Sequence, residues 1–242
     1  FVQKLNGFKL GLGSSAAVTV ALTRAVMGYL EIEGEELEPL RLFQRAHEIH
    51  QKMQGGIGSG LDIAASVFGG LVAFDEVGDG ETVLPRRLTG MEWPAMAPVF
   101  VGNSASTPDL VSKVNTYSET DPSGFRGLID EMSTLSERVI AASQQGDLLA
   151  IRQGCLMYCS LMQRLGKASG ADIISEGHRR LRDLSVENHF DYKPSGAGGG
   201  DLGLILGEQE TALQDLRPKV EALGASWTEL GISSLGVRLV TK

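Results

Sequence analysis

Three short stretches of the chain combine glycine with hydroxyl, carboxylate or ammonium side chains. The first, Gly11–Ala17, runs Gly-Leu-Gly-Ser-Ser-Ala-Ala, and the second, Gly58–Asp62, runs Gly-Ser-Gly-Leu-Asp. The third, Lys193–Asp201, contains four glycines within Gly196–Gly200. Glycine lets the backbone approach a ligand closely, and hydroxyl and carboxylate oxygens suit phosphate groups and hard metal ions. These stretches are therefore the candidates for a site that handles a phosphate group.

The first stretch opens a segment, Ser14–Leu30, whose apolar residues predict a helix that is buried nearly all round. The first N–H groups of a helix have no intrahelical acceptor and lie at the positive end of its dipole, so they bind anions. Ser14 and Ser15 add hydroxyls for phosphate oxygens or a magnesium ion, and either serine also suits the N-cap. We predict that the loop binds phosphate through Gly11, Leu12, Gly13, Ser14, Ser15 and Ala16.

Rival interpretations of this loop stay open. On the heptapeptide alone, a serine N-cap after a glycine turn has about the same weight as a functional loop. The two glycines and Ala16 also satisfy a dinucleotide-binding fingerprint, with Glu31 or Glu33 near the place of the ribose-binding acid. Against that fingerprint, Asn6–Lys9 is too polar for the parallel strand that should precede it. A Walker loop is excluded because no Lys-Ser/Thr pair follows the glycines.

The second and third stretches are more informative when they are considered together than when each is considered alone. By itself, Asp62 is more often the N-cap of the helix predicted at Leu61–Val67 than a catalytic acid. The glycines of Gly196–Gly200 exceed what a tight turn needs, and they cost conformational entropy directly before a predicted strand at Leu202–Leu206. That cost favours a functional loop.

In this order, the three stretches resemble the motifs of the GHMP kinase superfamily, which contains galacto-, homoserine, mevalonate and phosphomevalonate kinases. Gly11–Ala17 resembles its phosphate loop, Gly58–Gly70 the stretch that holds the acceptor-side aspartate, and Gly196–Gly200 its third motif. Lys193–Asp201 and Ser104–Val111 make the chain most similar to phosphomevalonate kinases, with mevalonate kinases as the close alternative. The resemblance covers essentially the whole chain.

The resemblance implies a two-domain α+β fold and an ATP-dependent kinase. We expect an N-terminal domain at residues 1–95, with the phosphate loop, and a C-terminal domain at 96–242, with the third glycine motif. Family members begin with a β-rich segment that carries a first motif and its lysine, whereas Phe1 stands only ten residues before the phosphate loop. We therefore expect the N-terminal domain to lack its first strands in this chain, and these residues to be inactive alone.

The resemblance also assigns roles. It implies that the phosphate loop holds the β- and γ-phosphates of ATP, that Ser15 contacts Mg²⁺, and that Asp62 and Lys193 are catalytic. The third glycine loop is expected to contribute to the ATP site through Ser195, Gly196, Ala197, Gly198 and Gly199.

The role expected of Asp62 depends on whether the phosphate acceptor is an alcohol or a phosphate monoester. An alcohol such as mevalonate needs a base close to its proton, whereas a phosphate monoester, with a second pKa of about 6, is already nucleophilic at neutral pH. For phosphomevalonate, Asp62 would orient the acceptor or magnesium, and a cation such as Lys193 would offset the facing charges. Ser59, Ser106 and Thr107 are expected to bind the acceptor, with helix capping as the alternative for the last two.

The helix predicted at Leu37–Met53 carries further polar candidates. The resemblance implies a second magnesium ligand on it, and spacing does not choose between Glu48 and Gln51. His47 and His50 share one face of this helix with no third ligand in view. We interpret both as core or boundary histidines rather than metal ligands.

The remaining elements are predicted from apolar periodicity and turn signals. Glu76–Gly90 is expected to be a hairpin tip or a connection. Strands are expected at Leu71–Phe74, Val99–Gly102, Leu202–Leu206, Ser226–Leu230 and Val237–Val240, and helices at Pro108–Tyr117, Phe125–Gln145, Leu148–Gly166, Asp172–Leu184 and Glu210–Leu223.

Composition limits the class of protein. A formal net charge of −8 argues against a sequence-independent nucleic-acid binder, and no apolar run is long enough to span a bilayer. Cys155 and Cys159 are expected to be reduced core thiols. We expect a cytoplasmic enzyme that acts on a small-molecule phosphate acceptor, without nucleic-acid or membrane partners and with homodimerisation left open. A non-catalytic sensor of ATP and metabolite on the same fold is the alternative, and a related decarboxylase is disfavoured.

Overall fold

The computed structural model divides the chain into two compact units. The first comprises Phe1–Gln3, Leu12–Gly90 and Gly231–Lys242, and the second comprises Lys4–Gly11 and Met91–Leu230. The structure describes residues 4–5, 8–9, 11–32, 34, 38–54, 59–77, 82–90, 92–102 and 107–239.

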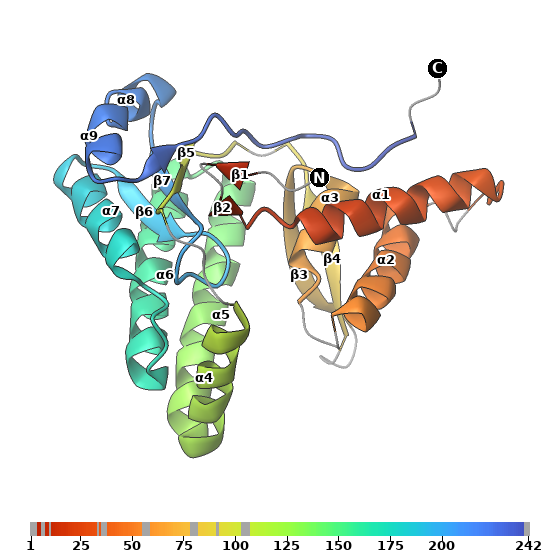
Figure 1. The fold of residues 1–242 in the computed structure, drawn as a ribbon, viewed down its shortest axis with the longest axis horizontal. Helices are drawn as coiled ribbons and strands as arrows, with labels where there is room; N and C mark the ends of the chain where they lie inside the picture. Colours follow the sequence, from red (N-terminus) through yellow and green to blue (C-terminus); the bar gives the residue numbers. More distant parts are fainter. Residues whose placement is uncertain are drawn as a thin grey trace. The chain divides into compact units, whose positions relative to one another are not determined.

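The described part of the first unit is built from helices and a β-hairpin (Figure 1). The helices are α1 (Ser14–Tyr29), α2 (Pro39–Met53) and α3 (Leu61–Phe68), and the hairpin is β3 (Leu71–Val77) with β4 (Thr82–Leu88). The two strands are antiparallel, with Leu71 opposite Leu88. The inward faces of the three helices form the core of this unit through Ala16, Val20, Met27, Leu42, Phe43, Ala46, Ile63, Ala64 and Val67.

The first long helix buries only one of its two apolar faces. Val20 is buried in the core, whereas Leu22 and Val26 keep 61% and 54% of their surface exposed. The expectation that this helix is buried nearly all round is therefore wrong for the second face. The reason is that α2 and α3 pack against α1 on the first face.

The segment from residue 231 to residue 239 returns to the first unit. It carries no strand over these residues, so the strand expected at Val237–Val240 is not formed in its described part. Three hydrogen bonds hold the segment, from the Gly70 N–H to the Ser233 carbonyl (2.7 Å), from the Val237 N–H to the Ser66 carbonyl (3.0 Å) and from the Arg87 guanidinium to the Ser234 carbonyl (2.6 Å).

The second unit contains an antiparallel sheet whose described strands have the order β6-β7-β5-β8. The strands are β5 (Ala95–Phe100), β6 (Asp191–Pro194), β7 (Leu202–Gly207) and β8 (Ser226–Trp227), with a separate short pair, β1 (Lys4–Leu5) and β2 (Phe8–Lys9). The helices are α4 (Thr107–Thr120), α5 (Pro122–Gln145), α6 (Leu148–Ser169), α7 (Glu176–Glu187), α8 (Glu210–Gln214) and α9 (Arg217–Ala222).

The helices of the second unit cover its sheet and share one core with it. α4, α5 and α6 run side by side (Figure 1), and α6 and α7 both pack on β6. The core takes residues from nearly every one of these elements, including Val99, Leu128, Cys159, Met162, Leu181, Tyr192, Ile205, Leu213, Val220 and Trp227. Cys155 and Cys159 are free, buried thiols, as expected.

The fold is α+β, as expected, and several further elements differ from the prediction. The helix predicted at Glu210–Leu223 divides into α8 and α9, because Pro218 has no N–H and its ring would clash with the carbonyl of Gln214 in a continuous helix. β4 lies in what was expected to be a hairpin tip or a connection. β6 was missed because it is short and polar. No helix in the described ranges combines the length and apolarity needed to cross a bilayer.

Candidate functional site

The N-terminus of α1 has backbone donors without intrahelical acceptors. Its N-cap is Gly13, in the left-handed region at φ 65°, and no side chain caps the helix. The first intrahelical bond runs from the Ala17 N–H to the Gly13 carbonyl (3.0 Å), so the three preceding N–H groups are free of the helix ladder. The expectation of a serine N-cap is therefore wrong. Glycine suits the cap because a Cβ there would be strained and only 3.1 Å from the Asp62 Cβ.

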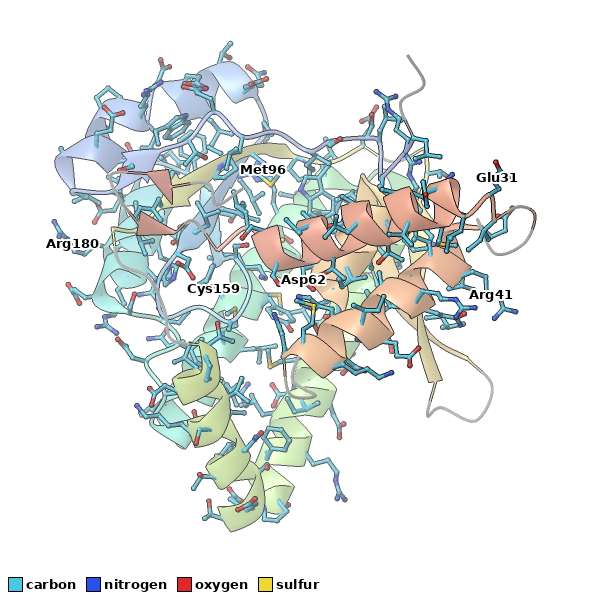
Figure 2. All side chains as sticks on the ribbon, turned by 45° about the vertical axis from the view of Figure 1, so that its right-hand side comes forward. Glu31, Arg41, Asp62, Met96, Cys159 and Arg180 are labelled. Carbon is cyan, nitrogen blue, oxygen red and sulfur yellow. The ribbon has the colours of Figure 1, made fainter. Side chains whose placement is uncertain are left out.

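Asp62 lies in the first turn of α3, beside this N-terminus (Figure 2). Gly60 is the N-cap of α3, so the reading of Asp62 as its N-cap is wrong. The Asp62 Oδ1 accepts a hydrogen bond from the Ile63 N–H at 2.9 Å, and the residue is exposed. The start of α1 and the start of α3 thus meet near one exposed carboxylate, and the positive ends of two helix dipoles face that point.

The hydroxyl of Ser15 contacts a buried histidine of α2. Ser15 is exposed, whereas His50 is only 3% exposed, and the Ser15 Oγ lies 3.2 Å from the His50 Nε2. The Gln54 Nε2 lies 3.1 Å from the same ring nitrogen. The sequence predicted a core or boundary histidine at His50 but gave no signal for its contact with Ser15, 35 residues away in sequence.

Glu48, one of the two candidates for a second magnesium ligand, points elsewhere. It lies two residues before His50, which places it on nearly the opposite face of α2. Its Oε1 accepts a hydrogen bond from the Lys52 ammonium at 2.6 Å on the exposed surface. Gln51 follows His50 directly, about 100° around the helix from it, and the choice between the two as a magnesium ligand stays a prediction.

His47 packs in a different way from His50. Its ring stacks on Phe43, with 5.3 Å between the ring centroids. Its Nε2 faces Gly60, where a Cβ would lie 2.9 Å away. This nitrogen is buried, and no hydrogen-bond partner for it exists among the residues that the structure describes. Ser59, next to Gly60, is exposed and accepts a long hydrogen bond from the Leu61 N–H at 3.4 Å.

In the second unit, the third glycine loop connects β6 to β7. Gly198 has φ 79°, and a Cβ there would overlap the carbonyl oxygen of Ile173. The same carbonyl accepts a hydrogen bond from the Gly199 N–H at 2.7 Å. Glycine is required at residue 198 because the loop passes directly over the backbone before α7. Ser195, Gly196 and Ala197 are exposed.

A buried histidine that sequence reasoning missed holds this loop to α7. The His178 Nε2 lies 3.1 Å from the Gly200 carbonyl oxygen, and the His178 Nδ1 lies 2.6 Å from the Tyr192 hydroxyl. A carbonyl only accepts, so Nε2 carries the proton and Nδ1 accepts from Tyr192. Burial lowers the pKa of His178 to about 4, which keeps the ring neutral. A lone histidine in an amphipathic helix gives no sequence signal of such a role.

The first glycine of the phosphate loop lies against the end of the third glycine loop. Both Gly11 and Asp201 belong to the second unit, and a Cβ on Gly11 would lie 2.9 Å from the Asp201 Cγ. The Asp201 carbonyl accepts a hydrogen bond from the Val101 N–H at 2.9 Å, which fixes this end of the loop to the residue after β5. Within the second unit, Gly11 and Asp201 are therefore neighbours although they are far apart in sequence.

Lys193 makes its contacts within the second unit. Its ammonium donates a hydrogen bond to the Pro194 carbonyl at 2.9 Å and lies 5.3 Å from the centroid of the Tyr158 ring on α6. Burial lowers the pKa of Lys193. Of the residues expected to bind the acceptor, Thr107 is the first residue of α4, and Ser106 lies outside the described residues.

The chain is similar to known kinases over nearly all of its length. Residues 8–70, which contain the phosphate loop and Asp62, match the model of the GHMP kinase N-terminal domain. A phosphomevalonate kinase from Saccharolobus solfataricus is 30% identical over 239 residues, covering 97% of this chain and 68% of the relative. The chain belongs to the GHMP kinase superfamily.

Further relatives of this GHMP kinase chain include both phosphomevalonate kinases and mevalonate kinases. A phosphomevalonate kinase from Streptomyces sp. (strain CL190) is 28% identical over 241 residues, covering 90% of the chain and 63% of the relative. A mevalonate kinase from Pyrococcus abyssi is 31% identical over 240 residues, covering 95% and 64%. The chain thus spans a little less than two thirds of the length of these two relatives.

Solved structures agree on the fold. A Lin0012 protein from Listeria innocua has a TM-score of 0.85 at 24% identity, covering 96% of this chain and 69% of that one. The phosphomevalonate kinase of Streptococcus pneumoniae, solved in complex with phosphomevalonate and AMPPNP, has a TM-score of 0.75 at 20% identity, covering 95% and 71%. This GHMP kinase chain therefore has the fold that its motifs predicted.

Proposed function

We propose that this GHMP kinase chain is the larger part of an enzyme that transfers the γ-phosphate of ATP to phosphomevalonate, which gives diphosphomevalonate for isoprenoid precursor synthesis. The observation that carries the proposal is the exposed Ser15 at the uncapped N-terminus of α1, beside the carboxylate of Asp62. The names of the two phosphomevalonate kinase relatives support this choice of acceptor.

The residues at the start of α1 fit a nucleotide phosphate and a magnesium ion. The free N–H groups after Gly13 supply donors, and the Ser15 hydroxyl supplies a hard oxygen ligand. No group of three or more His, Cys, Asp or Glu side chains in the described ranges is arranged to hold a metal. In kinases, Mg²⁺ takes one or two protein oxygens and completes its shell with substrate phosphates and water, so a single protein ligand such as Ser15 is sufficient. When bound, Mg²⁺ neutralises charge on the phosphate oxygens.

The remaining assignments belong to the same proposal. The third glycine loop, Ser195–Gly199, contributes backbone donors for ATP, and Lys193 supplies positive charge. Ser59, Ser106 and Thr107 bind the acceptor. Asp62 orients the acceptor or the metal ion, because a phosphate acceptor needs little help from a base. We place the reaction in the cytoplasm and keep homodimerisation as a proposal.

A mevalonate kinase is the second candidate function, and the 31% identity to the Pyrococcus abyssi mevalonate kinase favours it. In that case the acceptor is an alcohol, and Asp62 acts as its general base. The two candidates differ in the expected effect of Asp62→Asn. For a phosphate acceptor we expect kcat to fall about tenfold, whereas loss of a general base costs about 10²- to 10⁴-fold.

The test is an acceptor panel in which ADP release is followed. The full-length enzyme, of which this chain is the larger part, is incubated with magnesium ATP and with mevalonate, phosphomevalonate, homoserine or galactose. We expect ADP release with phosphomevalonate only. Release with mevalonate only supports the second candidate. Tight ATP binding without turnover on any acceptor contradicts both and supports the sensor.

Ser15→Ala links the panel to the site. We expect this change to lower kcat/KM at least about a hundredfold, because it removes a ligand of the metal that stabilises the transferred phosphoryl group. Thr23→Ala is the matched control on the same helix, since the Thr23 hydroxyl donates to the Thr19 carbonyl at 2.8 Å, two turns after Ser15. Equal activity of Ser15→Ala and Thr23→Ala would show that Ser15 has no role in the reaction.

A further inference from the structure

The contact between the loop and the second helix has a definite hydrogen-bond direction. The His50 Nε2 lies within hydrogen-bond distance of two groups, the Gln54 Nε2 at 3.1 Å and the Ser15 Oγ at 3.2 Å. With its amide nitrogen turned to the ring, Gln54 donates to the His50 Nε2, which is then the acceptor, carries no proton and shares its one lone pair between the two donors. A ring nitrogen without a proton cannot donate to Ser15. The Ser15 hydroxyl therefore donates its proton to His50.

That direction decides what the serine oxygen offers on its other side. A hydroxyl has one proton and two lone pairs. When its proton points toward the buried ring of His50, both lone pairs of the Ser15 oxygen are left for other partners. A metal cation binds to a lone pair and is repelled by a hydroxyl proton. A serine whose hydroxyl proton points toward a fixed acceptor therefore presents its oxygen to a cation better than a serine whose hydroxyl rotates freely.

The surroundings of His50 fit this task. His50 is buried in the α1–α2 interface, where its ring has little freedom to turn away. Gln54 lies one turn further along the same helix, and its N–H fixes which ring nitrogen accepts. An apolar side chain would fill the same place in the core with less loss of hydration. Orientation of the Ser15 hydroxyl would explain why the polar pair of His50 and Gln54 occupies this place.

We propose that His50 is a positioning residue, which holds the proton of the Ser15 hydroxyl so that the oxygen presents its lone pairs to the magnesium ion of the nucleotide complex. The inference rests on the proposed function, since it takes Ser15 as a metal ligand. It adds a residue outside the three glycine-rich stretches to the site, and it gives the buried His50 of α2 a role in metal binding.

The experiment measures metal binding without turnover. Mn²⁺ replaces Mg²⁺, AMPPNP replaces ATP, and free Mn²⁺ is followed by its electron paramagnetic resonance signal as protein is added. The variants, made in the full-length enzyme, are His50→Leu, Ser15→Ala and the double variant. Partners that orient metal ligands typically contribute about 10- to 100-fold to metal affinity. We expect His50→Leu to weaken Mn²⁺ binding to the nucleotide complex about tenfold, and to have no further effect when Ser15 is already alanine.

Two further variants separate positioning from packing. His50→Gln keeps a side-chain acceptor and is expected to recover part of the lost Mn²⁺ affinity. His47→Leu removes the other histidine of the same helix, which has no contact with Ser15 among the described residues, and is expected to leave Mn²⁺ affinity unchanged. A purely structural His50 would lower the unfolding temperature without these differences in metal affinity.

The outcomes distinguish this inference from the proposed function. If the unaltered protein forms the Mn²⁺–AMPPNP complex and His50→Leu binds Mn²⁺ equally well, the positioning role is overturned while the kinase proposal stands. Equal effects of His50→Leu with and without Ser15 would overturn it as well, because the histidine would not act through the serine. If the unaltered protein binds no nucleotide, the proposed function falls, and this inference falls with it.

Discussion

Lys193 shows how the contacts of one residue constrain its role. The ammonium donates to the carbonyl of the next residue and lies over the ring of Tyr158. These contacts stabilise a cation within the second unit, and burial lowers its pKa, which shows that the charge is partly removed from water. Such a lysine can serve the packing of β6 on α6, or it can supply positive charge to the reaction, as proposed.

Lys193→Met separates the two roles, because methionine keeps the length of the apolar stem and removes the charge. If Lys193 is catalytic, we expect kcat/KM to fall about a hundredfold, while the free energy of unfolding changes by no more than about 1 kcal/mol. Steady-state kinetics and denaturant unfolding of the same preparation provide the two numbers. Tyr158→Leu is the control for the ring contact. Full activity of Lys193→Met at altered stability would assign the residue to packing alone.

At the scale of elements, the hairpin of β6 and β7 depends on its attachment to α7. The neutral ring of His178 donates to the Gly200 carbonyl and accepts from the Tyr192 hydroxyl, so one side chain connects the helix, the strand and the glycine loop. Protonation of Nδ1 would break the bond from Tyr192 and would bury a charge. The attachment therefore requires the neutral form of His178.

The neutral His178 makes stability depend on pH in a defined window. Its folded pKa of about 4 lies below the usual 6.5, so the unfolded chain binds the extra proton between these values. The contribution to stability is complete above pH 6.5 and is lost as the pH falls toward 4. Between pH 7.5 and pH 5 we expect a loss of about 2 kcal/mol from this group.

Urea unfolding at pH 7.5 and pH 5 measures this effect. His178→Gln cannot titrate, so we expect it to be less stable than the unaltered protein at pH 7.5 and to lose about 2 kcal/mol less between the two pH values. The difference between the two proteins removes the contributions of all other titrating groups. Parallel pH dependence in both proteins would show that protonation of His178 does not cause the loss of stability.

At the scale of the whole molecule, each of the two units is built from segments that are separated in sequence. After a first passage at Lys4–Gly11, the chain enters the second unit again at Met91, leaves it at Leu230 and returns to the first unit with its last residues. The returning segment is held by backbone hydrogen bonds at Gly70 and at Ser66, so residues more than 160 positions apart stabilise one another. The first unit therefore depends on residues that come after the whole of the second.

Removal of residues 231–242 tests this dependence. We expect the first unit to lose about 3 kcal/mol, because three hydrogen bonds and the packing around them disappear, each bond contributing about 1 kcal/mol. Limited proteolysis is expected to cut within residues 12–90 faster than in the unaltered protein. The control is removal of residues 240–242 alone, which leaves all three bonds in place. Equal proteolysis of the two truncated proteins would contradict the dependence.

The sequence by itself determined the features that depend on neighbouring residues. Apolar periodicity predicted most of the long helices, such as α5 and α6, to within a few residues, because a helix forms between residues three and four apart. Three glycine-rich stretches in a fixed order were enough to predict the superfamily. Local signals failed for β6, which is short and polar, and for the helix that Pro218 divides.

Only the tertiary structure decided which residues meet. The choice of Gly13 over a serine as N-cap depends on the approach of Asp62 from α3, and the exposed face of α1 depends on where α2 and α3 pack. The contact of His50 with Ser15 and the attachment of Gly200 to His178 join residues from different elements. Such contacts are created by packing between distant parts of the chain, and a pattern of neighbouring residues does not encode them.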